Sequence, residues 1–506
     1  MPILPILLAA SFTVALILTP LLRSLATRIG LVDRPDTRRK IHLRIIPVAG
    51  GLAIFLSGTI VLAVAWIVPG SFRDLSANEG PRLLLLLVGC SIICAVGLLD
   101  DIITLRGRHK LFAQLLAIVV VMSPNFVVRN IRVFGWDVEL GLLSVPFTAF
   151  WLLAWTNALN LLDGMDGLLG TVTVIIAGTL GGIAVLEDQW VTASIAFVLM
   201  GTTLAYLVYN FPPASIFLGD CGSLSIGLLV GVLSIQATAG NQPTTWAPAS
   251  ALALLTIPMC DTLAAILRRK LTGRSVFNSD RGHLHHCLQR WGFSPRGVLG
   301  VVASLCLVSA GGALASLYWK IELVAVLTPL VLVAFLIKAG LFGHAEFVLV
   351  KKQIRAVIIR LFLRNLKGKV QQMQVRLQGS IEWEDLWARL VWFASELELV
   401  SISLDVNAPA IHEGYYAHWE VFGRSSEEGS EWHAEIPLEA WGPVVGRVVL
   451  RGHRQGDEFW NKIGTVVRSI DEFQTTGLPA VPGHRTTVHL TVHSKGQGQL
   501  TALPKE

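Results

Sequence analysis

The sequence predicts an all-α polytopic membrane protein with about 11 transmembrane helices, followed by a C-terminal cytoplasmic α+β domain. Three observations support this fold class. Hydrophobic residues make up 53% of the 506 residues and charged residues only 15%, which is too apolar for an ordinary soluble protein. Eleven apolar runs are long enough, or nearly so, to cross a bilayer. Beyond residue 343, amphipathic and alternating patterns replace these runs.

The eleven apolar runs define the predicted helices. They cover residues 3–22, 47–68, 83–103, 110–123, 141–161, 167–186, 190–209, 216–237, 247–267, 297–317 and 322–342. The run at 110–123 is short, and the run at 141–161 contains Pro146, a residue type that interrupts helix interiors. The first run continues into Arg23 without a small-residue cleavage site, so no cleavable signal peptide is expected. Five of the six cysteines lie in or beside apolar runs without a disulfide or zinc spacing, which indicates reduced packing residues.

The distribution of Lys and Arg orients the predicted spans. The loops at 23–44, 106–110 and 268–296 are rich in cations, whereas the loops on the other side have few. Cytoplasmic loops of membrane proteins carry an excess of Lys and Arg. The rich loops are therefore assigned to the cytoplasm, which puts the N-terminus outside and everything after about residue 344 inside. The predicted location is the inner (plasma) membrane, crossed many times.

Five clusters of unusual polar residues fall on the cytoplasmic face in this topology. A carboxylate at membrane depth costs about 2.5 to 3.5 kcal/mol, so such residues are normally retained for function. The clusters are 33–51 with Lys40 and His42, 97–114 with Asp100, Asp101 and Lys110, 156–170 with Asn157, Asn160, Asp163 and Asp166, 209–223 with Asn210, Phe217 and Asp220, and 280–286 with Arg281, His283, His285 and His286. An odd number of misplaced spans would scatter them over both faces, so their convergence supports the span count.

Three of the five clusters also have a simple structural interpretation when taken alone. Asp163 and Asp166 fit a helix end with two capping side chains at a water interface. Asp100 and Asp101 fit a solvated helix end, and the three histidines fit a zinc site with Cys287, although no second ligand pair at a zinc spacing follows. Taken together, carboxylates suited to a hard cation such as Mg²⁺ and cations suited to phosphate indicate a diphosphate site at the membrane interface.

Four motifs resemble those of the polyprenyl-phosphate N-acetylhexosamine-1-phosphate transferases. This superfamily, glycosyltransferase family 4, includes the bacterial undecaprenyl-phosphate N-acetylglucosaminyl-1-phosphate transferases and the phospho-N-acetylmuramoyl-pentapeptide transferases. The motifs are Gly-Leu-Leu-Asp-Asp at 97–101, Asn-Ala-Leu-Asn-Leu-Leu-Asp-Gly-Met-Asp-Gly at 157–167, Asn-Phe-Pro-Pro-Ala-Ser-Ile-Phe-Leu-Gly-Asp-Cys-Gly-Ser at 210–223 and Asp-Arg-Gly-His-Leu-His-His at 280–286. They occur in family order within residues 1–343. Any one would be weak, but chance agreement of all four is negligible.

The resemblance implies a reaction that initiates cell-envelope polysaccharide synthesis. A UDP-linked amino sugar gives its sugar 1-phosphate to undecaprenyl phosphate, and UMP is released. The basic loops resemble the N-acetylglucosamine branch, so UDP-N-acetylglucosamine is the expected donor, with another UDP-amino sugar or UDP-N-acetylmuramoyl-pentapeptide as alternatives. A lipid-linked sugar carrier or flippase is the alternative of a different class. It predicts polar residues near the middles of spans and often an internal repeat, whereas the acids here lie at span ends and no repeat is evident.

The resemblance also implies roles for individual residues. The implied metal ligands, for Mg²⁺ or Mn²⁺ as a substitute, are Asp220, Asp100 and Asp101. The residues expected to be catalytic are Asp100, Asp101, Asp220, His285 and His286. Substrate binding is expected from Lys40, His42, Lys110, Asn157, Asn160, Asp163, Asp166, Asn210, Phe217, Arg281 and His283. Direct attack of the lipid phosphate is favoured over a covalent enzyme intermediate, because a phosphate monoester is largely dianionic at neutral pH and hardly needs a general base. A homodimer is one assembly open to the protein, and no nucleic-acid partner is expected.

The rest of the chain departs from the family pattern. Residues 344–380 predict a basic amphipathic linker, in which a helix at 351–377 either lies on anionic headgroups or docks on the next domain. Residues 381–473 predict a small α+β domain of unassigned role, faintly like a GAF-type sensor, and residues 474–506 a disordered tail. The domain is expected to contain helices at 381–397 and 456–473 and strands near 398–406, 415–423, 431–438 and 444–451. Because every motif precedes residue 300, truncation after about residue 345 is expected to leave the chemistry intact.

Overall fold

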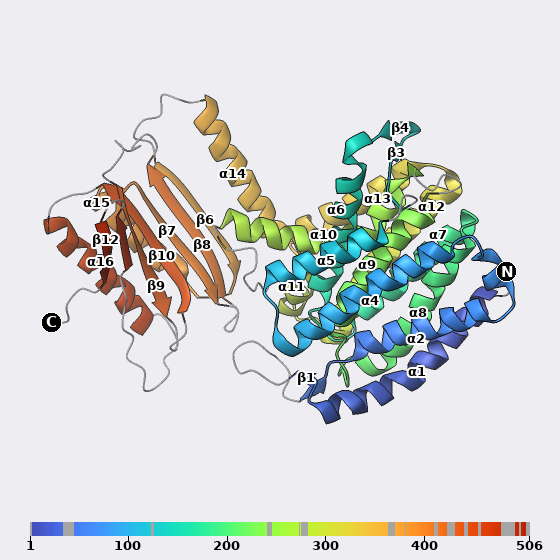
Figure 1. Cartoon of the computed structure of the whole chain (residues 1–506). Coiled ribbons are helices and arrows are strands. Elements are labelled where there is room, and N and C mark those ends of the chain that lie inside the picture. Colours follow the sequence, from blue (N-terminus) through green and yellow to red (C-terminus); the bar gives the residue numbers. More distant parts are fainter. Residues whose placement is uncertain are drawn as a thin grey trace. The chain divides into compact units, whose positions relative to one another are not determined.

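Figure 1 shows the computed structural model of the chain, which divides into two compact units. The first unit comprises Met1–Leu263 and His283–Leu341, and the second comprises Ala264–Gly282 and Phe342–Glu506. The boundary near residue 342 lies close to the predicted end of the transmembrane domain, but the second unit also includes residues 264–282. The structure describes residues 3–33, 45–122, 126–239, 245–272, 274, 282–362, 370–379, 381–408, 413–421, 431–439, 444–453, 457–476, 491–494 and 497–501.

The first unit is built from helices. Over the described residues, nine are long and apolar enough to cross a membrane, which indicates a multi-pass membrane protein. These are α1 (Ile3–Ile29), α2 (Gly50–Ile67), α4 (Gly80–Ile103), α6 (Ser144–Leu162, extended by the 3₁₀ turn Gly141–Leu143), α7 (Leu168–Leu186), α8 (Trp190–Asn210), α9 (Gly219–Ala237), α10 (Pro248–Leu271) and α12 (Pro295–Trp319). The shorter helices are α3 (Ser71–Leu75), α5 (Gly107–Val121), α11 (Leu284–Arg290) and α13 (Glu322–Lys338).

Nine of the eleven predicted spans coincide with these nine helices. The other two, at 110–123 and 322–342, form α5 with 15 residues and α13 with 17 residues. Both are shorter than the roughly 20 residues that an untilted helix needs to cross the hydrocarbon core. Pro146 does not interrupt α6, because it is the third residue of that helix, where a backbone N–H has no partner within the helix.

α9 is the central helix of the first unit. Its residues from Cys221 to Leu228 are all buried, and α2, α4, α6 and α7 pack around it. Two glycines permit this packing: a Cβ atom on Gly51 of α2 would collide with the backbone of Gly222, and one on Gly97 of α4 would collide with the backbone of Cys221. The close approach brings the C-terminal end of α4 against the N-terminal end of α9.

Short strands connect some of these helices, and the sequence did not predict them. β1 (Val32–Asp33) pairs with β2 (Ile46–Pro47), and β3 (Asn130–Val133) lies between β4 (Trp136–Glu139) and β5 (Thr245–Trp246). Val48, directly after β2, forms a parallel bridge with Phe217. This bridge ties the loop before α2 to the loop before α9.

The second unit is organised around a seven-stranded antiparallel sheet with the order β12-β11-β9-β10-β7-β8-β6. α15 (Trp383–Glu396) and α16 (Asp457–Thr476) share one hydrophobic core with the inward-facing residues of the sheet, such as Ile402 and Leu404. α14 (His344–Phe362) packs against β6. The strands are β6 (Val370–Gln378), β7 (Ser401–Ala408), β8 (Glu413–Val421), β9 (Glu431–Glu439), β10 (Val444–His453), β11 (Thr491–Ser494) and β12 (Gln497–Thr501).

The second unit confirms the predicted C-terminal α+β region, with two differences. The helix predicted at 351–377 ends at Phe362, and residues 370–378 form β6 instead. In β6, Met373 and Val375 are buried at a period of two, which marks a strand, but the pattern is too short to stand out beside the basic residues that precede it. The segment predicted as a disordered tail contains β11 and β12, whose pairing with β9 satisfies backbone groups in a way that composition does not reveal.

Candidate active site

Four of the predicted site residues meet where α4, α5, α6 and α9 come together. Lys110 Nζ on α5 lies 3.1 Å from Asp100 Oδ2 at the end of α4, and it also forms an ion pair with Asp220 at the start of α9. Asn160 on α6 donates a hydrogen bond of 2.8 Å to Asp220 Oδ1. The other oxygen of Asp100, Oδ1, accepts a hydrogen bond from Leu105 N at 2.5 Å. One ammonium group therefore holds two carboxylates that are 120 positions apart in the sequence.

Asp101 caps the N-terminus of α9. Its Oδ1 accepts a hydrogen bond from Asp220 N at 2.9 Å, and its Oδ2 accepts one from Cys221 N at 3.3 Å. The first N–H groups of a helix have no partner within the helix and carry its positive dipole end, so a carboxylate is favourable there. Gly219 has a φ of 76° and faces this carboxylate, which a Cβ atom would strike. We call Asp100, Asp101, Lys110, Asn160 and Asp220 the carboxylate centre.

The remaining polar residues of the second and third motifs brace the loops around this centre. Asp166 Oδ2 accepts a hydrogen bond from Ala214 N at 2.9 Å. Asn210 accepts one from Gly167 N and donates one to Ile216 O, both at 2.8 Å. The structure therefore gives Asp166 and Asn210 contacts that join the two motifs to each other. Asn157 pairs with Gln114 of α5, with Nδ2 of Asn157 3.0 Å from Oε1 of Gln114. Phe217 is half-buried, and its backbone N donates to Pro47 O at 2.8 Å.

Asp163 lies just after α6, outside the candidate spans, with an exposed side chain. The negative charges of Asp220, Asp101 and Asp166 lie close enough to oppose its ionisation. Asp163 is thus an accessible carboxyl group near the carboxylate centre.

The histidines of the fourth motif lie around α11 and are held by a carboxylate of α10. Asp261 Oδ2 lies 2.9 Å from Nδ1 of His283, and Asp261 Oδ1 accepts a hydrogen bond from Leu284 N at 2.7 Å. The rings of His283 and His285 stack with their centroids 5.9 Å apart, and the rings of His285 and His286 are 4.1 Å apart. We call Asp261, His283, His285 and His286 the histidine pocket. Asp261 fixes both a side chain and the backbone at the start of α11.

His285 differs from its neighbours because, among the described residues, neither of its ring nitrogens has a hydrogen-bond partner. The side chain is only 2% exposed, and its ring packs on Gly164, where a Cβ atom would lie 2.8 Å from Nε2. Burial, followed by the neighbouring His286, lowers the pKa of His285 to about 3. The imidazole is therefore neutral near pH 7. It can offer a phosphate oxygen one N–H donor rather than the positive charge expected from the sequence.

Comparison with known proteins decides the family. Residues 83–238 match the model described as glycosyl transferase family 4. The chain is 34% identical over 288 residues to a probable undecaprenyl-phosphate N-acetylglucosaminyl 1-phosphate transferase of Bacillus subtilis, which covers 56% of this chain and 77% of that relative. It is 32% identical over 325 residues to a decaprenyl-phosphate N-acetylglucosaminephosphotransferase of Mycobacterium tuberculosis, covering 59% of this chain and 78% of that relative. The chain belongs to glycosyl transferase family 4.

The family match covers the whole carboxylate centre, whereas the histidine pocket lies outside residues 83–238. The sequence motifs do not include Asp261. The signal that marks it is the one used for the other acids, namely a carboxylate within the apolar run at 247–267. Three expected site residues, Lys40, His42 and Arg281, lie outside the residues that the structure describes.

The carboxylate centre contains oxygen donors of the kind that a divalent cation requires. Within the described ranges, no three His, Cys, Asp or Glu side chains are grouped as they would be around a metal ion. Mg²⁺ does not require such a group, because it is usually bound through one or two carboxylates together with substrate phosphates. Asp100 and Asp220 fit that pattern, since an oxygen of each already converges on one cationic group, the Lys110 ammonium.

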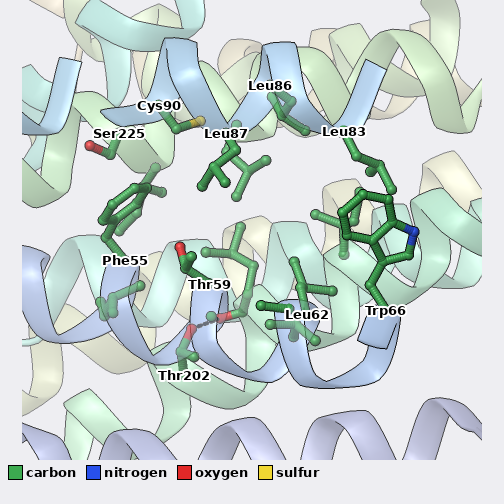
Figure 2. Close-up of a pocket in the computed structure, with 18 of the residues that line it drawn as sticks. Phe55, Thr59, Leu62, Trp66, Leu83, Leu86, Leu87, Cys90, Thr202 and Ser225 are labelled. Carbon is green, nitrogen blue, oxygen red and sulfur yellow. Dashed lines mark hydrogen bonds between the residues drawn. The ribbon is translucent and has the colours of Figure 1, made fainter. Parts of the chain in front are cut away.

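A cavity of about 380 Å³ lies between α2, α4, α8 and α9 of the first unit (Figure 2). Figure 2 shows Trp66 and Leu83 at one end and Cys90 and Ser225 toward the other. The hydroxyl groups of Ser225 and Thr202 are bonded to backbone carbonyls of their own helices. The lining is therefore almost entirely apolar and suits hydrocarbon rather than a sugar nucleotide. The end with Cys90 includes Ser225, which is five residues after Asp220 on α9.

Proposed function

We propose that the protein transfers N-acetylglucosamine 1-phosphate from UDP-N-acetylglucosamine to undecaprenyl phosphate and releases UMP. The observation that carries the proposal is the carboxylate centre, in which Lys110 joins Asp100 to Asp220 at the first turn of α9. The names of the relatives from B. subtilis and M. tuberculosis support both the sugar phosphate and a polyprenyl-phosphate acceptor. The alternatives of another UDP-amino sugar, the muramoyl-pentapeptide donor and a carrier are not favoured by these names.

In the proposed reaction an oxygen of the lipid phosphate attacks the β-phosphorus of the UDP-sugar. A new phosphorus–oxygen bond forms, the bond from the β-phosphorus to the bridging oxygen breaks, and UMP leaves with that oxygen. With a second pKa near 6, the lipid phosphate is mostly dianionic at neutral pH, so no side chain has to remove a proton from it. The main obstacle is the repulsion between two anions, which cationic and N–H groups overcome. Lys110 supplies a positive charge, and His283 and His285 supply ring nitrogens for phosphate oxygens.

We further propose Mg²⁺ as the cofactor, held by Asp220 and Asp100, with Asp101 fixing the helix end that presents Asp220. When bound, the ion would neutralise phosphate charge that the protein cannot neutralise alone. Asn160 orients the Asp220 carboxylate through its 2.8 Å hydrogen bond. Mn²⁺ would substitute, because it accepts the same oxygen donors.

In the proposed topology, α5 and α13 complete a set of eleven spans in the inner membrane. The loops rich in Lys and Arg, including the one that precedes the histidine motif, then face the cytoplasm, where nucleotide sugars are made available. The cavity along α9 would hold part of the acceptor's hydrocarbon chain, since it is apolar and begins near the carboxylate centre.

The function is tested with the purified full-length protein in detergent, undecaprenyl phosphate, Mg²⁺ and UDP-N-acetylglucosamine. UMP release that requires both lipid and metal is the expected result, with UDP-N-acetylmuramoyl-pentapeptide as the comparison donor. No UMP from any UDP-amino sugar would overturn the proposal. Labelled UMP is then offered to lipid-free enzyme with the UDP-sugar. Direct attack predicts no exchange of label, whereas sustained exchange requires a covalent sugar-phosphate enzyme.

A further inference from the structure

One face of α14 is held by the sheet of the second unit. Leu349 is only 1% exposed and packs in an apolar cluster with Met373 and Val375 of β6. Lys352 Nζ donates a hydrogen bond of 2.8 Å to Gln374 O of the same strand. These contacts fix the rotation of the helix about its own axis, so the face that points away from the sheet is defined as well.

The opposite face of α14 carries a line of large apolar side chains. Phe347, Ile354 and Ile358 are 53%, 54% and 49% exposed. Their spacing of seven and four residues puts them on one line along an α-helix, which turns once in about 3.6 residues. Lys351 and Arg355 are exposed within and beside this line. We call these five residues the outer stripe of α14.

α14 covers the face of the sheet that is opposite to α15 and α16. On β8, Tyr415 and Ala417 belong to the core that contains residues of α15 and α16, whereas Tyr416 between them packs in the cluster with Leu349 of α14. Successive side chains of a strand point to opposite faces of a sheet. An extended surface that meets the outer stripe therefore cannot meet α15 at the same time.

The chain connects α14 closely to the membrane unit. Five residues separate Lys338, the last residue of α13, from His344, the first residue of α14. A connection of this length reaches at most about 20 Å when fully extended. The start of α14 is therefore tethered within that distance of the end of α13, which is a helix of the multi-pass unit.

We propose that the outer stripe binds the surface of a bilayer that contains anionic lipids. The three apolar side chains lie below the headgroups, and Lys351 and Arg355 lie among the lipid phosphates. An apolar line flanked by Lys and Arg is the pattern of helices that lie in a membrane interface, where anionic lipids attract cations. The basic residues and the short tether favour a bilayer over a protein partner. The sequence left headgroups and the next domain open as alternatives for this segment, and the two faces of α14 contact one each.

The test uses the full-length protein in nanodiscs of phosphatidylcholine alone or in an equal mixture with phosphatidylglycerol. Ile354→Cys receives a polarity-sensitive fluorophore in a Cys260→Ser, Cys287→Ser background, since these two cysteines are not fully buried. Ala388→Cys is the matched reporter, because it is exposed on α15. In the mixture we expect the Ile354→Cys fluorophore to emit at shorter wavelength and to be quenched by lipids with brominated acyl chains. The Ala388→Cys fluorophore should show neither change.

The second part of the test changes the charge. Lys351→Gln should lower the ratio of bound to free stripe about fivefold in the mixed nanodiscs. Arg389→Gln removes an exposed cation from α15 and should leave the ratio unchanged. Raising the salt concentration should weaken quenching in the mixture, because it screens the attraction to the headgroups. None of these readouts requires transferase activity, so the result does not depend on the proposed function.

Three results would overturn the inference. The first is the absence of quenching of the Ile354→Cys fluorophore in both lipids. The second is emission at shorter wavelength without quenching, because a protein surface rather than lipid would then cover the stripe. The third is equal quenching in Lys351→Gln and Arg389→Gln, which would show that the charge of the stripe does not contribute to binding.

Discussion

The carboxylate centre and the histidine pocket satisfy their polar groups differently. In the carboxylate centre, Lys110 joins Asp100 and Asp220, and Asp101 accepts two backbone N–H groups. In the histidine pocket, Asp261 satisfies His283, but the ring nitrogens of His285 have no partner among the described residues. A buried polar group without a partner costs about 1 to 3 kcal/mol. The comparison teaches that one region is held together by its own contacts, whereas the other contains a ring whose hydrogen-bonding groups the described residues leave unused.

The two regions also differ in how many elements support them. Four helices, α4, α5, α6 and α9, contribute to the carboxylate centre, so each charge is held from several directions. The histidine pocket depends on one carboxylate of α10 and on the chain that enters α11. We therefore expect the centre to respond to changes in charge and the pocket to respond to changes in position.

The largest effect is expected from Asp220→Asn. The substitution keeps the shape and removes the charge that pairs with Lys110 and that is proposed to hold Mg²⁺, so UMP release should fall about 10³-fold or more. Thermal unfolding should remain close to wild type, because Asn160 and Ser223 still surround the position. Asp137→Asn, in the exposed hairpin of β3 and β4, is the control. Activity within about tenfold of wild type would show that the centre is structural and would remove the basis of the comparison.

The sequence predicted the membrane helices and the members of the carboxylate centre, because both depend on strong local signals. The length of an apolar run corresponds to the thickness of the bilayer. An acidic residue in such a run has a high free-energy cost of insertion, so its presence indicates a functional role. The sequence did not predict that the carboxylates of Asp100 and Asp220 would both contact the Lys110 ammonium. Lys110 was expected to bind substrate, which stays a prediction, and its bonds to Asp100 and Asp220 depend on how α4, α5 and α9 are arranged.

Other features depended on tertiary contacts that no local pattern records. Asn210 and Asp166 bond to backbone groups of neighbouring loops, and their role in substrate binding stays a prediction. β11 is a strand because β9 is present to pair with it. The neutral state of His285 follows from its burial against Gly164, whereas the motif alone suggests a cation. Residue types in the sequence identify candidate residues, whereas tertiary packing determines their protonation states and their hydrogen-bond partners.

The second-largest effect is expected from Asp261→Asn, which tests whether the histidine pocket depends on position. The amide keeps one acceptor for Leu284 N but loses the charge that orients His283, so kcat/KM for the UDP-sugar should fall about 10- to 100-fold, the range for partners that orient a ligating histidine. The acceptor KM should stay unchanged. Asp261→Glu, which restores the charge on a longer arm, should recover part of the loss. If Asp261→Asn impaired the kinetics of the acceptor as much as those of the UDP-sugar, the histidine pocket would not be specific for the donor.

A smaller effect concerns stability as a function of pH. The pKa of His285 is lowered from 6.5 to about 3, so the unfolded chain binds more protons between these values and stability falls as pH drops below about 6.5. From pH 7 to pH 5, this histidine should cost about 2 kcal/mol of unfolding free energy. His283, His286 and Asp261 face the same ring and are present in both proteins compared. His285→Gln should lose clearly less stability over this interval than wild type, and His344→Gln, which removes an exposed histidine, is the control. Equal acid sensitivity in His285→Gln and wild type would mean that the imidazole is not buried as a neutral group.

The smallest effect is expected from a substitution in the apolar cavity, which tests whether the hydrocarbon chain of the acceptor lies beside the carboxylate centre. Thr59 lines the apolar cavity, and its exposed neighbour Ile60 does not, so Thr59→Phe and Ile60→Phe form a matched pair on α2. A phenyl ring in the cavity that displaces one CH₂ group of the acceptor, at about 0.8 kcal/mol, should raise KM for undecaprenyl phosphate about fourfold. KM for the UDP-sugar and for a short prenyl phosphate should not change, because neither extends along the cavity. If instead Thr59→Phe is folded and its long-chain KM equals that of Ile60→Phe, the hydrocarbon lies elsewhere. The cavity then gives no support for placing the acceptor's hydrocarbon chain beside the carboxylate centre.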